Sequence, residues 1–371
     1  MKSLAVIGGV LLILVVLWDT FETMILPRTV SRKLRLTGVF YQVVRQGLDI
    51  GLRVVSGRLR TTFLVAYGPL SLLMLIVFWA VCLIFGFAML HWGLGSPLTG
   101  IKGRPDFGVS LYFSGVTFLT LGFGDVTAHS AWGRTLSVLE AGVGFGFLAV
   151  VISYLPVLYQ TFSRREVSIL LLDARAGTPP TAGELLRRHG MAQNLDALQE
   201  LLRDKERWAA ELLESYLSYP ILAFYRSQHE EVSWLSAITA ILDTCALIKV
   251  GFRGEIHGQK ALQWQAQLTF AMARHTLVDL AYILGVPPIS PENERLTPEG
   301  WKQLRQLLET AGIPLSSGET AQKELQEYRR LYEPYVNGLA ARLYLEVPPW
   351  LLQEQAADNW QTSAWDNENH L

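Results

Sequence analysis

Residues 106–125 read DFGVSLYFSGVTFLTLGFGD, and the interpretation of the whole chain starts from this stretch. Its first part, residues 106–119, has no internal proline. It is too short to cross a bilayer but suits a re-entrant half-helix. Asp106 follows Pro105 and can cap the start of that helix. The carboxyl end of the helix then carries the negative end of the helix dipole, which favours a nearby cation.

The helical pattern stops after Leu119, and residues 120–125 read TLGFGD. A dehydrated potassium ion needs a cage of oxygens to replace its water. Backbone carbonyls can form this cage if every second residue adopts unusual dihedral angles, which glycine tolerates cheaply. Gly122 and Gly124 occupy alternate positions, and the Thr120 hydroxyl can add the innermost ring of oxygens. The pattern predicts a filter that binds K+ through Thr120, Leu121, Gly122, Phe123 and Gly124.

The other features of this stretch have consequences for its surroundings. Leu121 and Phe123 are expected to point away from the axis and to pack behind the filter. Asp125 places a carboxylate at the outer mouth, where it can hydrogen-bond behind the filter and attract cations. Irregular backbone is tolerated at membrane depth only inside protein or beside water. One filter strand cannot enclose an ion, so closed symmetry is required, and four chains are the natural number by analogy with known pores.

Three apolar segments approach the roughly 20 residues that a membrane helix needs. They are an N-terminal helix within residues 1–27, a helix at 69–92 and an inner helix at 135–162. Half of the 371 residues are hydrophobic and the mean hydropathy is +0.25, which suits a membrane part joined to a soluble part. The first segment is short, so Asp19 and Glu22 are expected near an interface. The alternative for this segment is a cleaved signal peptide, although no A-x-A site follows it.

A basic segment, residues 28–66, separates the first two spans. Residues 28–60 carry eight basic residues against the single acid Asp49, an excess typical of cytoplasmic loops. The amino terminus is therefore expected outside the cell, and the chain after residue 162 inside it. Residues 39–64 alternate apolar and basic residues at roughly helical spacing. This pattern predicts an amphipathic helix on anionic lipid or, alternatively, a plain cytoplasmic linker helix.

The inner helix contains residues that weaken or charge a membrane span. Gly142, Gly144 and Gly146 each cost about 1 kcal/mol relative to alanine, and Pro156 can kink the helix, so together they predict a bendable gate. The alternative is that small residues merely allow close helix packing. Glu140 is an ionisable group inside the span, and such groups are usually functional. It can tune the pore field, bind a cation or pair with a neighbouring pore helix.

Together with Thr117, the filter stretch resembles the potassium-channel signature T-x-x-T-x-G-[YF]-G-D. Residues 110–114 are similar to the pore helix of bacterial members, and Trp132-Gly133-Arg134 is similar to the W-G-R that opens the inner helix of bacterial two-transmembrane potassium channels. Counted from there, Gly144 falls at the hinge glycine of that family. The resemblance implies a pore domain over residues 67–162, with pore helix 106–119 and filter 120–125. It also implies a homotetramer in the bacterial inner membrane.

Some positions depart from the pattern that this resemblance implies. Val116 stands where several members have a glutamate that pairs with the filter aspartate. Tyr112 and Phe113 replace an aromatic pair that is often tryptophan, and Phe123 replaces tyrosine. These changes bear on gating and inactivation more than on selectivity. The residues expected to support the filter are Asp125, Thr117, Val116, Tyr112 and Phe113.

Residues 163–352 are expected to form a helical cytoplasmic domain, and residues 353–371 a disordered tail. Residues 1–162 carry a net charge of +6 and residues 163–371 carry −7, which fits a membrane region followed by a solvated domain. No alternating β-α pattern with G-x-G-x-x-G appears, so a Rossmann-type regulatory domain is not expected. Helical periodicity occurs near 194–217, 231–251, 259–284, 298–311 and 319–345.

A few polar residues of this domain are candidate ligand groups. His275 and Asp279 share a helix face at i, i+4, a spacing that metal sites use, and His229 is a further candidate. The alternative for the pair is a surface contact or a helix cap, since no third ligand is specified. Asp243 lies in an apolar run and is expected to be a buried, hydrogen-bonded carboxylate.

The sequence as a whole predicts an all-α membrane protein: a tetrameric pore-loop channel with an α-helical cytoplasmic domain. The expected function is passive, potassium-selective conduction, gated or assembled by the cytoplasmic helices. The alternatives are a weakly selective cation channel and a non-conducting sensor or scaffold. No G-x-S-x-G, H-E-x-x-H or P-loop is present, so an enzyme is not expected. The expected partners are the bilayer, anionic lipid at residues 28–66 and an unidentified cytoplasmic ligand, with no nucleic acid and no cofactor besides permeant K+.

Overall fold

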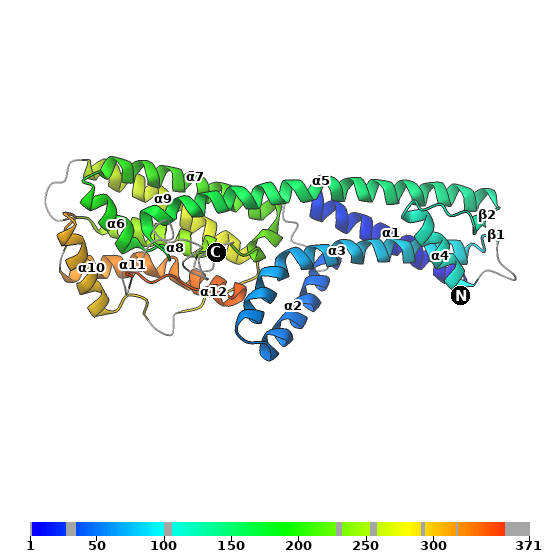
Figure 1. The fold of residues 1–371 in the computed structure, drawn as a ribbon, viewed down its shortest axis with the longest axis horizontal. Coiled ribbons are helices and arrows are strands. Elements are labelled where there is room, and N and C mark those ends of the chain that lie inside the picture. Colours follow the sequence, from blue (N-terminus) through cyan, green and yellow to red (C-terminus); the bar gives the residue numbers. More distant parts are fainter. Residues whose placement is uncertain are drawn as a thin grey trace, which may run out of the picture. The chain divides into compact units, whose positions relative to one another are not determined.

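The chain divides into two compact units, residues 1–160 and residues 161–371, which are considered separately below (Figure 1). The sequence places this boundary after residue 162. The structure is a computed structural model, and it describes residues 2–26, 35–99, 106–227, 232–252, 258–290, 294–316 and 318–352. The tail expected over residues 353–371 lies outside the described residues.

The first unit consists mainly of helices, and its described residues include one pair of very short strands. The strands β1 (Leu98–Thr99) and β2 (Thr127–Ala128) pair antiparallel and bring together the two ends of the segment that contains the filter stretch. The helices are α1 (Lys2–Met24), α2 (Leu36–Val54), α3 (Arg58–Gly93), α4 (Phe107–Phe118) and α5 (Ala131–Ala176), the last of which continues into the second unit.

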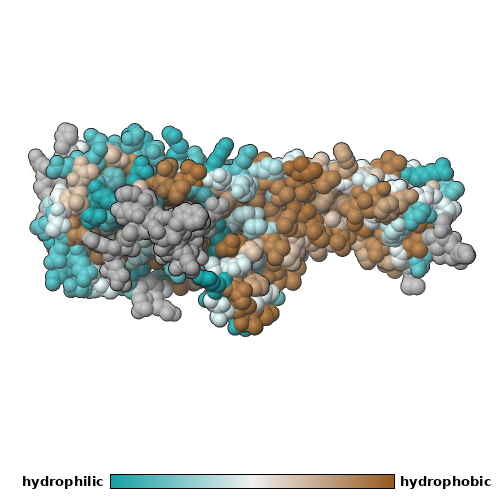
Figure 2. All heavy atoms as spheres, in the orientation of Figure 1, coloured by the Kyte–Doolittle hydropathy of each residue, from teal (hydrophilic) through white to brown (hydrophobic). Residues whose placement is uncertain are grey.

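Helices α1, α3 and α5 are long and apolar enough to cross a membrane, and α4 is a shorter apolar helix. In Figure 2 hydrophobic side chains cover most of the visible surface of these helices within the first unit, whereas hydrophilic side chains dominate the surface of the second. The three spans predicted from the sequence are therefore present as helices.

Three boundaries differ from the sequence expectation. The amphipathic stretch expected over residues 39–64 is two helices, because the backbone becomes extended at Val55, after α2, and Gly57 with φ +62° precedes α3. Helix α3 starts at Arg58 rather than at residue 69 and continues through Pro69. Helix α5 runs from Ala131 to Ala176 rather than from 135 to 162. Hydropathy detects the lipid-facing length of a helix and not the polar turns that extend it.

Helices α1 and α3 approach each other closely through glycines. A Cβ on Gly9 would lie 2.7 Å from the Gly86 carbonyl oxygen, and a Cβ on Gly86 would lie 2.8 Å from Ile13 Cγ1. Where α1 begins, a Cβ on Gly93 would lie 2.9 Å from the Lys2 carbonyl oxygen. Small residues at these positions let the two backbones meet, as is common between membrane helices.

Asp19 and Glu22 lie in the last two turns of α1, and both are buried within the first unit. Asp19 is 4% exposed and accepts hydrogen bonds from the Thr37 backbone N–H at 3.0 Å, from the Thr37 hydroxyl and from Trp79 Nε1 at 2.9 Å. Glu22 accepts a hydrogen bond from Trp18 Nε1 at 2.7 Å. The Asp19 carboxylate thereby joins α1, α2 and α3, which the apolar pattern alone does not reveal.

We predict that Gly9→Ala destabilises the protein by about 1–3 kcal/mol, because the added methyl group meets a helix carbonyl that cannot move aside. Gly8→Ala is the matched control, since a Cβ there meets only the end of the flexible Met89 side chain, at 3.0 Å. Thermal unfolding in detergent measures both variants. Equal melting temperatures for the two would contradict the close α1–α3 packing.

The second unit is a helical domain built around one central helix. Helix α8 (Trp234–Val250) is buried along its whole length except at Lys249, as expected for a helix that is apolar on all sides. Helix α9 (Gln259–Ile283) packs against both α8 and α7 (Leu195–Ser218). The other elements are α6 (Ala182–Met191), the 3-10 helix η1 (Pro220–Phe224), α10 (Pro298–Thr310), α11 (Glu319–Arg330) and α12 (Glu333–Leu343).

Helices α7 to α10 match the periodic stretches of the sequence closely, but the stretch expected over residues 319–345 is two helices. The break falls at Leu331 and Tyr332, directly before α12. Pro334 lies in the first turn of α12, where its missing N–H needs no partner. In the interior of one long helix the same proline would remove a hydrogen bond.

Asp243 on α8 is buried and hydrogen-bonded, which confirms the sequence expectation. Its carboxylate lies 2.6 Å from Arg295 Nη2 and accepts a hydrogen bond from the Tyr332 hydroxyl. Arg295 also lies 3.1 Å from Glu333, which in turn lies 3.0 Å from Arg329. Two carboxylates and two guanidinium groups therefore alternate, and no charge in this buried network lacks a partner.

Candidate pore loop and the start of the second unit

The pore helix α4 carries the loop that contains the filter stretch. The Asp106 side chain accepts a hydrogen bond from Val109 N at 2.9 Å, so it caps the helix as the sequence predicts. At the other end, Thr120 N donates to the Thr117 carbonyl at 3.0 Å and Leu121 N donates to the Val116 carbonyl at 2.9 Å. These two bonds attach the start of the loop to the last turn of α4.

The backbone of the loop alternates between two conformations. Thr120, Gly122 and Gly124 have φ values of +55°, +60° and +77°. Glycine adopts this region at no steric cost, whereas a β-branched residue such as Thr120 adopts it only under strain. The structure thus has the alternation that lets consecutive carbonyls point to one side of the chain.

Asp125, the aspartate at the end of the expected filter stretch, has a side-chain partner on α4. Asp125 accepts a hydrogen bond from the Tyr112 hydroxyl at 2.7 Å and a second from Val126 N at 3.0 Å. Val116, which stands where related pores have a glutamate, is buried and has no polar group to offer. Phe113 is also buried, with its ring 5.0 Å from that of His91. The side-chain partner of Asp125 on α4 is therefore a tyrosine.

The side chains of Leu121 and Phe123 are not covered by their own chain. They are 52% and 66% exposed, although the sequence analysis expects them to pack behind the filter. Leu119, directly before the loop, is 55% exposed as well. A single chain therefore lacks the neighbours that this expectation requires.

Glu140 on α5 is fully buried and pairs within its own chain. Its Oε2 lies 3.2 Å from His91 Nε2 on α3, and its Oε1 is hydrogen-bonded with the Ser114 hydroxyl on α4. Ser114 Oγ also lies 2.7 Å from the Ile84 carbonyl oxygen of α3. Among the three roles considered for Glu140, this geometry matches pairing with a pore helix, and it adds His91 as a second partner.

The glycines of α5 differ from one another in their surroundings. A Cβ on Gly144 would lie only 2.0 Å from the Phe118 carbonyl oxygen, at the end of the pore helix. Cβ atoms on Gly142 and Gly146 would meet nothing within 4 Å. Helix α5 is continuous across all three and across Pro156. Gly144 therefore has a packing role in this structure, and its role as a hinge stays a prediction.

We predict that Gly144→Ala displaces the end of the pore helix and abolishes most ion flux, whereas Gly142→Ala and Gly146→Ala keep it. The overpacking penalty for Gly144→Ala is about 1–3 kcal/mol or more, because the contact is with backbone. Flux into liposomes and thermal unfolding measure the three variants side by side. A hinge role alone predicts a folded, stable Gly144→Ala protein with altered gating.

Arg165 anchors the part of α5 that belongs to the second unit. Its guanidinium donates to Tyr216 Oη at 2.7 Å, to the Leu222 carbonyl at 3.0 Å and to the Tyr225 carbonyl at 2.8 Å. The neighbouring Glu166 supplies a carboxylate at 2.8 Å. The buried cation is thus fully surrounded by acceptors, and it ties α5 to α7 and η1. Sequence analysis did not identify Arg165, because three of its partners, Tyr216, Leu222 and Tyr225, lie 51 to 60 residues away along the chain.

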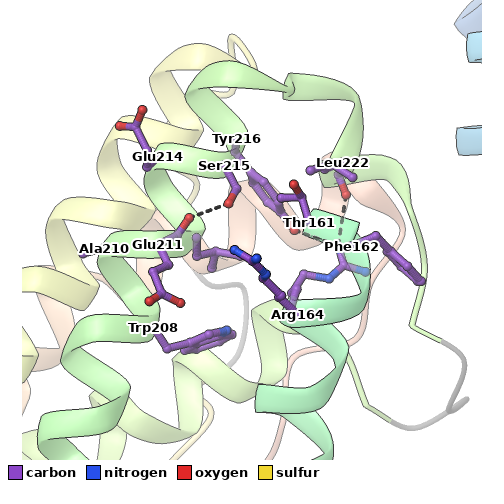
Figure 3. Close-up of a pocket in the computed structure, with 12 residues that line it drawn as sticks. Thr161, Phe162, Arg164, Trp208, Ala210, Glu211, Glu214, Ser215, Tyr216 and Leu222 are labelled. Atoms are coloured by element: carbon purple, nitrogen blue, oxygen red, sulfur yellow. Dashed lines mark hydrogen bonds between the residues drawn. The ribbon is translucent and has the colours of Figure 1, made fainter. Parts of the chain in front are cut away.

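A pocket of about 400 Å³ lies beside this anchor (Figure 3). Residues of α5 line one side and residues of α7 line the other, with Leu222 of η1 at one end. Arg164 and Glu211 are among the lining residues, so the pocket carries charges of both signs.

The ligand groups proposed from the sequence are not brought together into a site. His275 and Asp279 lie 3.5 Å apart on α9, with side chains 61% and 40% exposed, as an exposed pair at i, i+4. His229 lies outside the described residues. Within the ranges that the structure describes, no group of three or more His, Cys, Asp or Glu side chains could hold a metal ion.

Lys205 on α7 is a buried cation that contacts α5. Its Nζ donates to the Ser168 carbonyl at 2.6 Å and lies 5.4 Å from the centre of the Trp208 ring. Burial, aided by the nearby charge of Arg175, lowers the pKa of the Lys205 ammonium to about 8. The folded protein therefore releases this proton more readily than an unfolded chain does.

We predict that Lys205 makes the protein more stable as the pH rises from about 8 to 10.5. In this window the unfolded chain holds the Lys205 proton and the folded protein does not, so raising the pH favours folding, by up to about 3 kcal/mol over the window. Melting temperatures of wild type and Lys205→Met, measured at each pH, should converge or cross as the pH rises. The exposed Lys302→Met serves as the control and should leave the pH dependence unchanged. A constant difference between wild type and Lys205→Met would contradict the prediction.

His91 is a second residue that sequence reasoning missed. It lies in the apolar run at 69–92, and an ionisable group in such a run is a candidate functional residue by the same argument that identified Glu140. The signal was therefore present in the sequence, but not the identity of its partner.

Comparison with known proteins concerns mainly the first unit. Residues 73–160, which span most of α3, all of α4 and the first part of α5, match the family model described as "Ion channel". The uncharacterized membrane protein YdjJ of Bacillus subtilis is 24% identical over 316 residues, 83% of this chain and 86% of that protein. Protein LctB of Bacillus caldotenax is 35% identical over 94 residues, 23% of this chain and 69% of that protein. No solved structure matches the chain.

Proposed function

Because the chain belongs to the ion channel family, we propose that it is one subunit of a channel that conducts K+ passively and selectively through residues 120–124. The chain is an all-α membrane protein, and its ion channel region contains the pore loop. The observation that carries the proposal is the alternation of positive φ at Thr120, Gly122 and Gly124. Such a backbone offers rings of carbonyl oxygens that can replace the hydration shell of K+.

The proposal includes assembly as a homotetramer, and the surfaces that a single chain leaves uncovered support it. The loop backbone is not helical, and such backbone is stable at membrane depth only inside protein or beside water. Leu121 and Phe123 are largely exposed in one chain, and so are several apolar residues of α5, among them Val138 and Phe145. Neighbouring copies arranged with closed symmetry would cover these surfaces and complete the cage around the ion.

The orientation and the lipid contacts of the chain belong to the same proposal. The excess of basic residues over residues 28–60 supports an amino terminus outside a bacterial inner membrane and a second unit in the cytoplasm. Helix α2 exposes an apolar face that includes Val39, Val43 and Ile50, and it carries Arg45 and Arg53. Figure 2 shows hydrophobic side chains on the lobe that this helix forms. An anionic membrane surface is a suitable partner for such a helix.

The second unit is proposed to gate or assemble the pore through α5. This helix is continuous from residue 131 to residue 176, so it contains both the proposed pore-lining segment and the segment that Arg165 anchors in the second unit. Through this shared helix the second unit is covalently connected to the proposed pore. The pocket beside Arg165 is a candidate place for a cytoplasmic ligand to act.

We predict that purified protein in liposomes carries K+ faster than Na+, that barium blocks the flux, and that Gly122→Asp abolishes it. Gly285→Asp is the matched control, because Gly285 has the same left-handed backbone (φ +63° against +60°) and equally open surroundings in the second unit. It should keep the flux. Loss of flux in both variants would point to misfolding.

The other outcomes select between the alternatives. Equal K+ and Na+ flux would replace the proposal with a weakly selective cation channel. Absent flux would indicate a closed gate or a non-conducting scaffold, and a chain truncated after residue 163 separates these two, since only a channel gains flux when its gate is removed.

A further inference from the structure

Three helices of the first unit meet at one buried polar cluster. It consists of His91 on α3, Ser114 on α4 and Glu140 on α5, and each of these side chains is essentially inaccessible to solvent. The hydrogen-bond contacts run from His91 Nε2 to Glu140 Oε2 at 3.2 Å, from Glu140 Oε1 to Ser114 Oγ, and from Ser114 Oγ to the Ile84 carbonyl oxygen at 2.7 Å. Together they form a chain of three contacts that ends on a backbone carbonyl.

Among the described residues, His91 is the only ion-pair candidate for Glu140, and His91 Nδ1 is buried without a hydrogen-bond partner. A doubly protonated imidazole would leave that N–H unpaired in the interior, which is costly. A neutral imidazole with its single proton on Nε2 avoids this cost and can donate to Glu140. An ionised Glu140 would then be an uncompensated charge inside a membrane helix.

Counting hydrogens gives an arrangement without that charge. Ser114 has one hydroxyl hydrogen, and the Ile84 carbonyl can only accept. If Ser114 donates to Ile84, the contact between Ser114 and Glu140 needs a hydrogen from the carboxyl group. In that case each of the three contacts contains one hydrogen. His91 donates to Glu140, Glu140 donates to Ser114, and Ser114 donates to the Ile84 carbonyl.

We propose that Glu140 is protonated and is a positioning residue for the pore loop. The neutral chain runs from His91 Nε2–H to Glu140, from the Glu140 carboxyl to Ser114, and from the Ser114 hydroxyl to Ile84. It holds α4 between α3 and α5, and the loop starts on the last turn of α4 through the Val116 and Thr117 carbonyls. The effect on conduction rests on the proposed channel function, whereas the protonation of Glu140 does not.

Substitutions at position 140 separate hydrogen bonding from volume. Glu140→Gln can keep the pattern, because its amide N–H donates to Ser114 and its carbonyl accepts from His91. Glu140→Leu keeps a similar volume and loses both bonds. We expect Glu140→Gln to keep the K+ to Na+ flux ratio and Glu140→Leu to lower it by about tenfold, as expected when buried hydrogen bonds are lost.

Infrared spectroscopy of the full-length wild type tests the protonation directly. At neutral pH we expect the C=O stretch of a protonated, buried carboxyl group. This band should disappear in Glu140→Gln and shift in Ser114→Ala, which removes the acceptor of the proton. The control is Glu319→Gln, a glutamate whose side chain is 92% exposed, and it should leave the band unchanged.

Each outcome decides the proposal. Absence of the band in the wild type overturns it, and so does a band that persists in Glu140→Gln. If Glu140→Gln does not assemble, the Ser114→Ala variant decides the question instead. A carboxyl C=O band at the same frequency in wild type and Ser114→Ala would then overturn the proposal. A present and responsive band in a protein without K+ flux would refute the channel function and leave the protonation of Glu140 standing. Equal flux ratios in Glu140→Gln and Glu140→Leu would refute the positioning role alone.

Discussion

Hydrocarbon offers no hydrogen bonds, so a membrane chain must satisfy its own backbone polar groups or place them against protein, water or ions. Helices meet this requirement internally, but residues 120–125 do not, because their backbone is not helical. The rest of the first unit can be understood as support for this segment. This segment begins directly after the end of helix α4. Two backbone hydrogen bonds, donated by Thr120 N and Leu121 N, attach the segment to the last turn of α4. Gly144 lets α5 approach the same end closely enough to touch the Phe118 carbonyl.

Two of the buried carboxyl groups of the first unit, Asp19 and Glu140, have different sets of partners. Asp19 receives three donors, including a backbone N–H and an indole N–H, and none of its contacts requires it to donate. Glu140 instead contacts Ser114, whose hydroxyl also contacts the Ile84 carbonyl, and His91, whose Nδ1 is buried without a hydrogen-bond partner. That arrangement suits the protonated carboxyl group proposed above.

In the second unit, several buried charged side chains form ion pairs with side chains of opposite charge. The network of Asp243, Arg295, Glu333 and Arg329 alternates in sign, and Arg165 is surrounded by carbonyls, a phenol and Glu166. Removing one charged member of such a network leaves its buried partners with an incompletely compensated charge, which costs several kcal/mol. These contacts therefore specify one arrangement of the helices around α8. The inner helix shares in that arrangement because its final turns belong to the second unit.

The sequence by itself determined the place of the pore loop, the three spans, the cap at Asp106 and most helices of the second unit. Each of these depends on residues close together in the chain: glycines at alternate positions, apolar periodicity, a capping side chain. Only the tertiary structure decided that Asp19 bonds Trp79, that Glu140 bonds His91 and Ser114, that Gly144 faces a carbonyl and that Asp243 pairs with Arg295. The partners in these side-chain pairs are 26 to 60 residues apart, and periodicity carries no information about which faces meet. The physical reason is that a buried polar group selects its partner by geometry in three dimensions, whereas helix formation and loop conformation follow from local backbone preferences.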